Sequence, residues 1–106
     1  MEYMTIKDFD ESLNQLIRQK QLNSVCKKVL KCIHLARLGK PLEEVFRSLQ
    51  MTNHGEKRIR KSRKYNLGGK AYRLITQLDK DICVFLFAGS HDECDQWLNN
   101  NSGFRI

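Results

Sequence analysis

Long hydrophobic runs, linkers and repeats are all missing from this 106-residue sequence. The longest unbroken apolar run, residues 82–88, is seven residues long, which suits a buried strand, whereas a membrane-spanning helix takes about 20. The first four residues show no basic segment followed by an apolar one, so we expect no secretory signal. With one proline and no Pro/Ser-rich tract, the chain is expected to form one domain over residues 1–106, in the cytoplasm and without a membrane partner.

Metal-binding and disulfide patterns are also missing. The sequence has four cysteines and three histidines, but no C-x-x-C pair occurs, and His34, His54 and His91 do not stand at zinc-like spacing from the cysteines. Reduced thiols are the simpler interpretation for a cytosolic domain. We therefore expect no metal and no other cofactor.

The positive charge, by contrast, is abundant and concentrated. The chain has a net charge of +7; residues 57–73 contain eight Lys/Arg and no Asp/Glu, whereas residues 74–106 have a net charge of −3. A basic segment of this density favours a polyanionic partner, most often nucleic acid. A solvated basic strand, or an anchor for an acidic protein, is the alternative interpretation.

The first half of the sequence has helical periodicity. Two amphipathic helices are expected to form a hairpin, with Asp8 or Asp10 capping the first helix, and a short third helix is expected over residues 42–49. The apolar stripes are Phe9, Leu13, Leu16 and Ile17 in the first helix and Leu22, Val25, Cys26, Val29, Leu30, Ile33 and Ala36 in the second.

The second half has the pattern of an antiparallel meander. Ser90, with Glu93 three residues later, then has the spacing of a capping box and predicts a terminal helix through Leu98. The predicted fold class is α+β: an N-terminal helical hairpin packed on one face of a twisted three- to four-stranded antiparallel sheet, with a short C-terminal helix. The basic segment would lie on the free face of the sheet. Its expected strands are residues 57–64, 71–78 and 82–88, preceded by a loop over 51–55.

Two residues are candidates for binding a phosphate group or for transferring a proton to or from it. Arg73 lies at the middle of an otherwise apolar predicted strand, where it is either a surface side chain or a clamp for phosphate oxygens. His91 follows the buried strand at the start of the terminal helix. There it either makes local hydrogen bonds or serves as a general acid or base.

The loop before the basic segment offers further candidates. Glu56 is either a base or an ion-pair partner of the neighbouring cations, and His54 is a second candidate base.

Cleavage of RNA by its own 2′-hydroxyl group requires a base, cations around the phosphate and an acid for the leaving oxygen, and it needs no metal. The candidate RNA-binding residues are Lys57, Arg58, Arg60, Lys61, Arg63, Lys64, Lys70 and Tyr65, the last through stacking on a base.

The sequence resembles the RelE/ParE superfamily of bacterial toxin–antitoxin toxins, with the RelE/HigB-like branch favoured. The resemblance rests on the helical hairpin and on three segments, residues 53–58 (NHGEKR), 70–75 (KAYRLI) and 85–93 (FLFAGSHDE). It implies a ribosome-dependent, metal-independent mRNA endonuclease that is neutralised by a cognate antitoxin. It also implies that Arg73 contacts the scissile phosphate and that His91 is the general acid.

The resemblance further implies that the basic strand, including Lys57, Arg58, Arg60, Lys61 and Arg63, binds RNA and the ribosome. The sequence departs from the pattern of the superfamily at Asp92 and Glu93, which directly follow the histidine. Two other functions fit the same fold: a ParE-like, non-catalytic inhibitor of DNA gyrase or topoisomerase, and an inactive RNA-binding module. The joint presence of Arg73 and His91 favours the nuclease.

Overall fold

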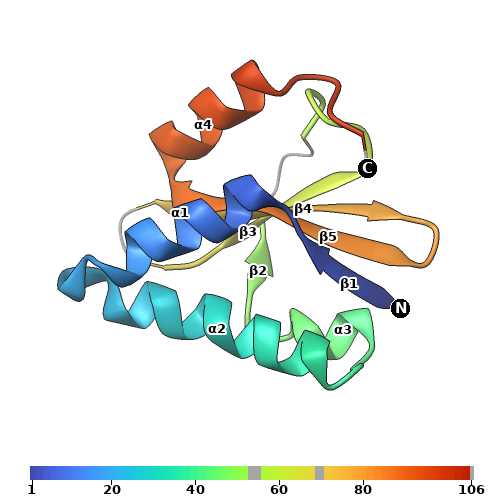
Figure 1. Ribbon diagram of the computed structural model, residues 1–106, viewed down its shortest axis with the longest axis horizontal. Helices are drawn as coiled ribbons and strands as arrows, with labels where there is room; N and C mark the ends of the chain where they lie inside the picture. The colour runs from blue at the N-terminus through green and yellow to red at the C-terminus, as the bar shows by residue number, and fades with distance from the viewer. Residues whose placement is uncertain (53–55, 69–70, 106) are drawn as a thin grey trace.

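The structure, a computed structural model, describes residues 1–52, 56–68 and 71–105. The strands form one sheet in the order β1-β5-β4-β3-β2, in which β1 is parallel to β5 and the other pairs are antiparallel (Figure 1). The predicted α+β class is confirmed, with five strands in place of three or four. The elements are β1 (Glu2–Thr5), α1 (Lys7–Ile17), a 3-10 turn η1 (Lys20–Leu22), α2 (Asn23–Arg37), α3 (Leu42–Val45), β2 (Gln50–Met51), β3 (Ser62–Asn66), β4 (Tyr72–Asp79), β5 (Ile82–Ser90) and α4 (His91–Asn100).

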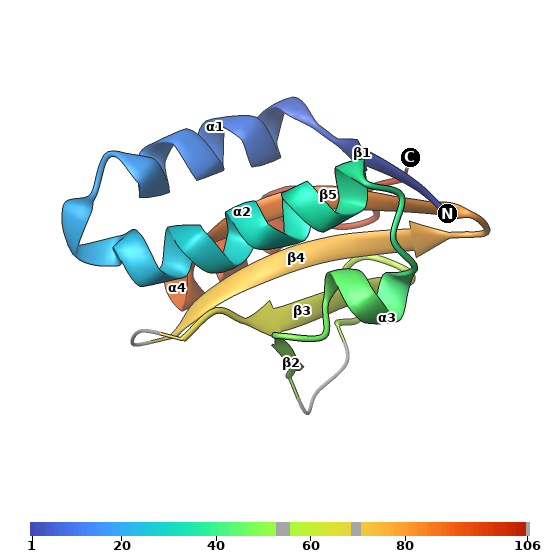
Figure 2. The same ribbon diagram turned by 90° about the horizontal axis from the view of Figure 1, so that it is seen from below.

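The sheet is covered on both faces, as Figures 1 and 2 show, so the face that was expected to be free is partly covered by α4. Helices α1, α2 and α3 cover one face, which we call the hairpin face, and α4 covers part of the other, which we call the α4 face. Alternation along β4 divides its side chains accordingly: Leu74 joins the buried cluster under the hairpin, and Ile75 joins the cluster under α4.

The hairpin face is a continuous apolar core. Phe85 of β5 contacts Phe9 of α1 edge-on, with ring centroids 5.3 Å apart, and lies 5.7 Å from the ring of Phe46. β1 pairs with β5 only as far as Phe85, and beyond that point α1 runs along the uncovered edge. There the Ser12 hydroxyl accepts a hydrogen bond from the Ala88 N–H at 3.0 Å, so a buried backbone donor is satisfied.

Helix α4 begins where the sequence predicts it. The Ser90 hydroxyl accepts from the Glu93 N–H, and the Glu93 carboxylate accepts from the Ser90 N–H, which is the predicted capping box. Trp97 packs against Phe87 with centroids 5.7 Å apart, and its indole N–H donates to Asp8 of α1 at 2.9 Å. Asp8 therefore binds α4, and neither it nor Asp10 caps α1, whose N-cap is Ile6 without a side-chain hydrogen bond.

The basic segment departs most from the prediction. Residues 57–61 are not a strand; β3 starts only at Ser62 and lies between β4 and the short β2, so it is not an edge. The reason is Ile59, which is fully buried in the α4-face cluster and pulls the chain out of the sheet.

Three smaller differences follow from tertiary packing. α3 ends at Val45 instead of continuing to residue 49, and Gln50–Met51 pairs with β3 although a loop was expected over 51–55. On α2, Leu30 is exposed and Cys32 is buried in its place. Among the described residues, none of the helices is both long enough and apolar enough to cross a membrane.

Candidate active site

The site is built on a row of three residues that cross the sheet on the α4 face. Arg73 of β4 pairs with Asn66 of β3 on one side and with Gly89 of β5 on the other. The Arg73 guanidinium donates to the Tyr72 carbonyl at 3.0 Å, and no carboxylate in the described part of the chain pairs with it. A half-buried cation without an acid partner is available for an anionic ligand.

Gly89 lets the start of α4 pack closely on β5. A Cβ at this position would lie 3.0 Å from the Phe87 ring and 3.2 Å from the Glu93 carboxylate, so a larger residue would crowd the first turn of α4. Gly89 therefore fixes the place where α4 begins, next to its strand partner Arg73.

The backbone holds His91 two residues beyond Gly89, at the start of α4. Its N–H donates to the Ala71 carbonyl at 2.6 Å, and the Ser90 capping box fixes the first turn of α4 in which it stands. The imidazole is 56% exposed, and its Nδ1 lies 3.3 Å from Asp92 Oδ1. The backbone at His91 is thus fixed, and more than half of its side chain is exposed to solvent.

Glu56, in the loop before β3, is bound to two cations. Its carboxylate, 5% exposed, accepts from Arg58 Nε at 2.7 Å and from Arg58 Nη2 at 2.8 Å, and it pairs with Lys64 at 3.3 Å. The Arg58 hydrogen bonds are the main cause that lowers the pKa of Glu56 to about 2, and Lys64 adds to them, against a burial effect that would raise it. A carboxylate with this pKa is a weak base, so the geometry favours the ion-pair interpretation.

Arg58 extends this network to α4. Its Nη1 donates to Asp95 Oδ1 at 2.7 Å and to Asn99 Oδ1 at 2.9 Å. With both edges of the guanidinium occupied by protein, Arg58 positions the loop against α4 and is a poor candidate for direct RNA contact.

The remaining basic residues are divided between the faces of the sheet. Alternation along β3 places Lys64 on the α4 face with Arg73, and Arg63 on the hairpin face with Tyr65. Tyr65 is 4% exposed and stacks on Phe46 at 4.5 Å, so the predicted base-stacking residue lies in the core. Exposed and away from these networks are Lys57, Arg60 and Lys61, whereas His54 and Lys70 lie outside the described residues.

Asn66 was not singled out from the sequence. Its Oδ1 is buried and has no hydrogen-bond partner in the described part of the chain, and it stands beside Arg73 in the row. The signal that could have found it is the alternation of β3, which puts Asn66 on the face of Lys64.

The cysteines are structural. All four are free and buried, and burial raises the pKa of Cys32 to about 11 and those of Cys83 and Cys94 to about 12. Such thiols stay protonated and unreactive at neutral pH, which agrees with the predicted reduced state. Within the described ranges no group of three or more His, Cys, Asp or Glu side chains is placed to hold a metal ion.

Comparison with known proteins identifies the fold. No family model matches the chain, and no curated protein sequence matches it. Among solved structures, a Helicobacter pylori toxin, in a copper-bound variant with a leucine replaced by serine, is similar with a TM-score of 0.58 and 22% identity over 88% of this chain and 97% of that chain.

Two structures involving the Escherichia coli protein YafQ are similarly close. A chain of the DinJ–YafQ complex, a toxin–antitoxin complex, has a TM-score of 0.55 and 17% identity over 87% of this chain and 94% of that chain. A YafQ variant with a histidine replaced by glutamine has a TM-score of 0.56 and 16% identity over 88% and 96%. The chain therefore has the fold of these toxins, as the sequence resemblance implies.

Proposed function

We propose that this protein is the toxin of a toxin–antitoxin module and cuts mRNA on the ribosome without a metal. The observation that carries the proposal is the Asn66–Arg73–Gly89 row. It places Arg73, whose guanidinium has no carboxylate partner among the described residues, across the strand pair from Gly89, two residues before His91. The shared fold with toxins agrees with it.

In the proposed reaction the RNA 2′-hydroxyl oxygen attacks the adjacent phosphorus, and the bond from phosphorus to the 5′-oxygen breaks. Arg73 would stabilise the negative charge that develops on the phosphate oxygens. His91, in its protonated form, would give its proton to the departing 5′-oxygen. The products are a 2′,3′-cyclic phosphate and a 5′-hydroxyl, and the reaction needs no external water.

The proton of the 2′-hydroxyl has to pass to a base. Glu56 is bound to Arg58 and Lys64 and has a pKa of about 2, so in this proposal it orients those cations. His54 stays the candidate base that the sequence offers.

The ribosome enters the proposal because of the exposure of the site. With the His91 side chain 56% exposed, the protein by itself does little to immobilise a flexible RNA strand, and catalysis depends on alignment of the reacting atoms. An RNA already held in a fixed path would supply that alignment. A cognate antitoxin, as in the DinJ–YafQ complex, would then control the free toxin.

The test is translation in a purified system, with primer extension to map cuts in the mRNA. His91→Gln is expected to slow cutting by about 10²- to 10⁴-fold and Arg73→Gln by about 10²- to 10³-fold, both without a change in melting temperature. His34→Gln and Arg37→Gln, at exposed positions on α2, are the matched controls. Intact mRNA together with a failure of DNA supercoiling by gyrase would replace the nuclease with the ParE-like function.

A further inference from the structure

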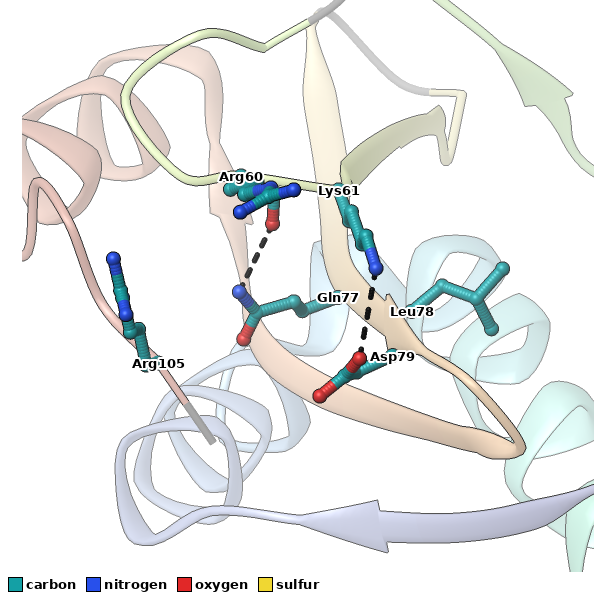
Figure 3. Close-up of a pocket in the computed structure, with 6 residues that line it drawn as sticks. All are labelled: Arg60, Lys61, Gln77, Leu78, Asp79 and Arg105. Carbon is teal, nitrogen blue, oxygen red and sulfur yellow. Dashed lines mark hydrogen bonds and ion pairs between the residues drawn. The ribbon is translucent and has the colours of Figure 1, made fainter.

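A second cationic feature lies on the α4 face, at the other end of β4. It is a cavity of about 230 Å³ between the loop before β3, the end of β4 and the C-terminal tail (Figure 3). The residues that line it are Arg60, Lys61, Gln77, Leu78, Asp79 and Arg105.

The charge of this cavity is unbalanced. Lys61 pairs with Asp79 at 3.6 Å, but neither Arg60 nor Arg105 has a carboxylate partner in the described part of the chain. In Figure 3 the Arg60 side chain lies above the Gln77 amide and the Arg105 side chain to its left. Two unpaired guanidinium groups around one hollow are suited to an anion with several oxygens, such as a phosphate.

Gln77 builds the walls of the cavity. It is 5% exposed, and its Nε2 donates to the Arg60 carbonyl at 3.0 Å and to the Phe104 carbonyl at 3.2 Å. These hydrogen bonds hold the loop before β3 and the C-terminal tail against the same position of β4. They therefore fix the backbone at Arg60 and next to Arg105. The Gln77 Oε1 stays without a partner among the described residues, a cost that a residue serving only to fill the core would avoid.

The loop wall is held in a strained conformation. Lys61 has a φ of 59°, in the left-handed region that non-glycine residues rarely adopt, and its carbonyl accepts from the Leu78 N–H at 3.0 Å. The Ser62 hydroxyl also donates to the Ile59 carbonyl at 2.8 Å. Local strain that persists because its surroundings fix it is typical of ligand-binding sites.

The cavity is in line with the candidate active site. Gln77 and Arg73 lie on the same face of β4, four residues apart, which corresponds to about 13 Å along a strand. A stacked nucleic-acid strand rises by about 3.4 Å per nucleotide, so roughly four nucleotides would span the two positions. A single RNA strand could therefore occupy both at once.

We propose that this cavity binds a backbone phosphate of the RNA strand, about four nucleotides from the phosphate at Arg73. The inference rests on the proposed function and adds a second, non-catalytic contact to it. Arg60 and Arg105 hold the phosphate, and Gln77 is a positioning residue that keeps them apart.

The test is binding of a labelled single-stranded RNA, long enough to span both positions, by fluorescence anisotropy over a series of salt concentrations. The double variant Arg60→Gln, Arg105→Gln is expected to bind roughly tenfold more weakly at low salt, with a salt slope lower by about 0.7 for one lost phosphate contact. The control, Lys27→Gln with Lys31→Gln, removes the same charge from the exposed side of α2. Equal affinities of the two double variants would overturn the inference.

Cleavage on the ribosome separates this inference from the proposed function. The Arg60→Gln, Arg105→Gln variant should need more toxin for half-maximal cutting and reach the wild-type rate at saturation, whereas Arg73→Gln should lower the rate at saturation. If no variant and no wild-type protein cuts mRNA, the proposed function fails while the RNA-binding result still decides the cavity. Unchanged RNA binding together with weaker antitoxin binding would assign the cavity to an acidic peptide and contradict the inference.

Discussion

The two faces of the sheet are filled by different kinds of side chain, although they share the same strands. On the hairpin face the buried apolar and aromatic residues form one continuous cluster around Phe85, and the small hydroxyl residues Ser12 and Thr76 are the polar ones buried beside it in the described part of the chain. On the α4 face the apolar cluster is smaller and centres on Trp97. Its margins hold polar side chains that a core would exclude: Asn66, Arg73 and Gln77.

The difference suggests that the hairpin face mainly stabilises the fold, whereas the α4 face carries the side chains of the candidate site. A continuous apolar face contributes most of the burial free energy. A face that carries half-buried cations and unpaired amide oxygens gives up part of that energy, and such compromises are typical of functional sites. We therefore expect substitutions of apolar residues to cost more stability on the hairpin face than on the α4 face, and substitutions of Arg73 to affect the proposed reaction with little effect on folding.

The largest expected effect compares two phenylalanines on β5. Phe85 is 1% exposed between the rings of Phe9 and Phe46, so Phe85→Ala should cost about 4 kcal/mol in the free energy of unfolding. Phe87 is half-buried against Trp97 on the α4 face, and Phe87→Ala should cost about 1 to 2 kcal/mol, since less of its surface is removed from water. Urea unfolding of both variants gives the two values. Equal costs would show that the two faces contribute alike.

The next effect concerns the ion pairs that support the α4 face. Glu56 stabilises the fold fully above its ordinary pKa of 4.5, and the stabilisation disappears as the pH falls towards about 2, because the folded state favours the ionised carboxylate. The shift corresponds to about 3 kcal/mol. Glu56→Gln should lose this amount near pH 7 and should unfold with a weaker dependence on pH below 4.5.

Unfolding by urea over a series of acidic pH values measures that prediction. Glu11→Gln is the matched control, because Glu11 pairs with Lys7 at 3.8 Å with a side chain 64% exposed, and surface pairs of this kind contribute little. A Glu56→Gln variant that matches Glu11→Gln in stability would mean that the buried network does not hold the site together.

The parts of the fold that the sequence predicted correctly are those that depend on local sequence patterns. The helix α2, the β4–β5 hairpin and the capping box at Ser90 each depend on residues within one element or one turn, and each was confirmed. β1 was not predicted, because its four residues pair in parallel with β5 about 80 positions away, and no local pattern encodes that partner.

The candidate site follows the same rule. The face on which Arg73 lies follows from strand alternation, and the place of His91 follows from the cap of α4. The Glu56–Arg58 contact to Asp95 and the cavity between Arg60 and Arg105 join segments about 40 residues apart. The charge pattern of the sequence indicates a basic segment, but it does not show which of the Lys and Arg side chains form ion pairs with carboxylates of the protein itself.

The smallest effect tests a side-chain hydrogen bond that joins the two helical layers, from Trp97 of α4 to Asp8 of α1. Asp8→Ala leaves the buried indole N–H without an acceptor and should cost about 1 to 2 kcal/mol in the free energy of unfolding. Asp10→Ala is the control, since Asp10 also lies in the first turn of α1 and so shares the interaction with the helix dipole. The difference between the two variants isolates the hydrogen bond. If they prove equal, α4 packs on the sheet independently of the hairpin, and the two faces are coupled only through the strands they share.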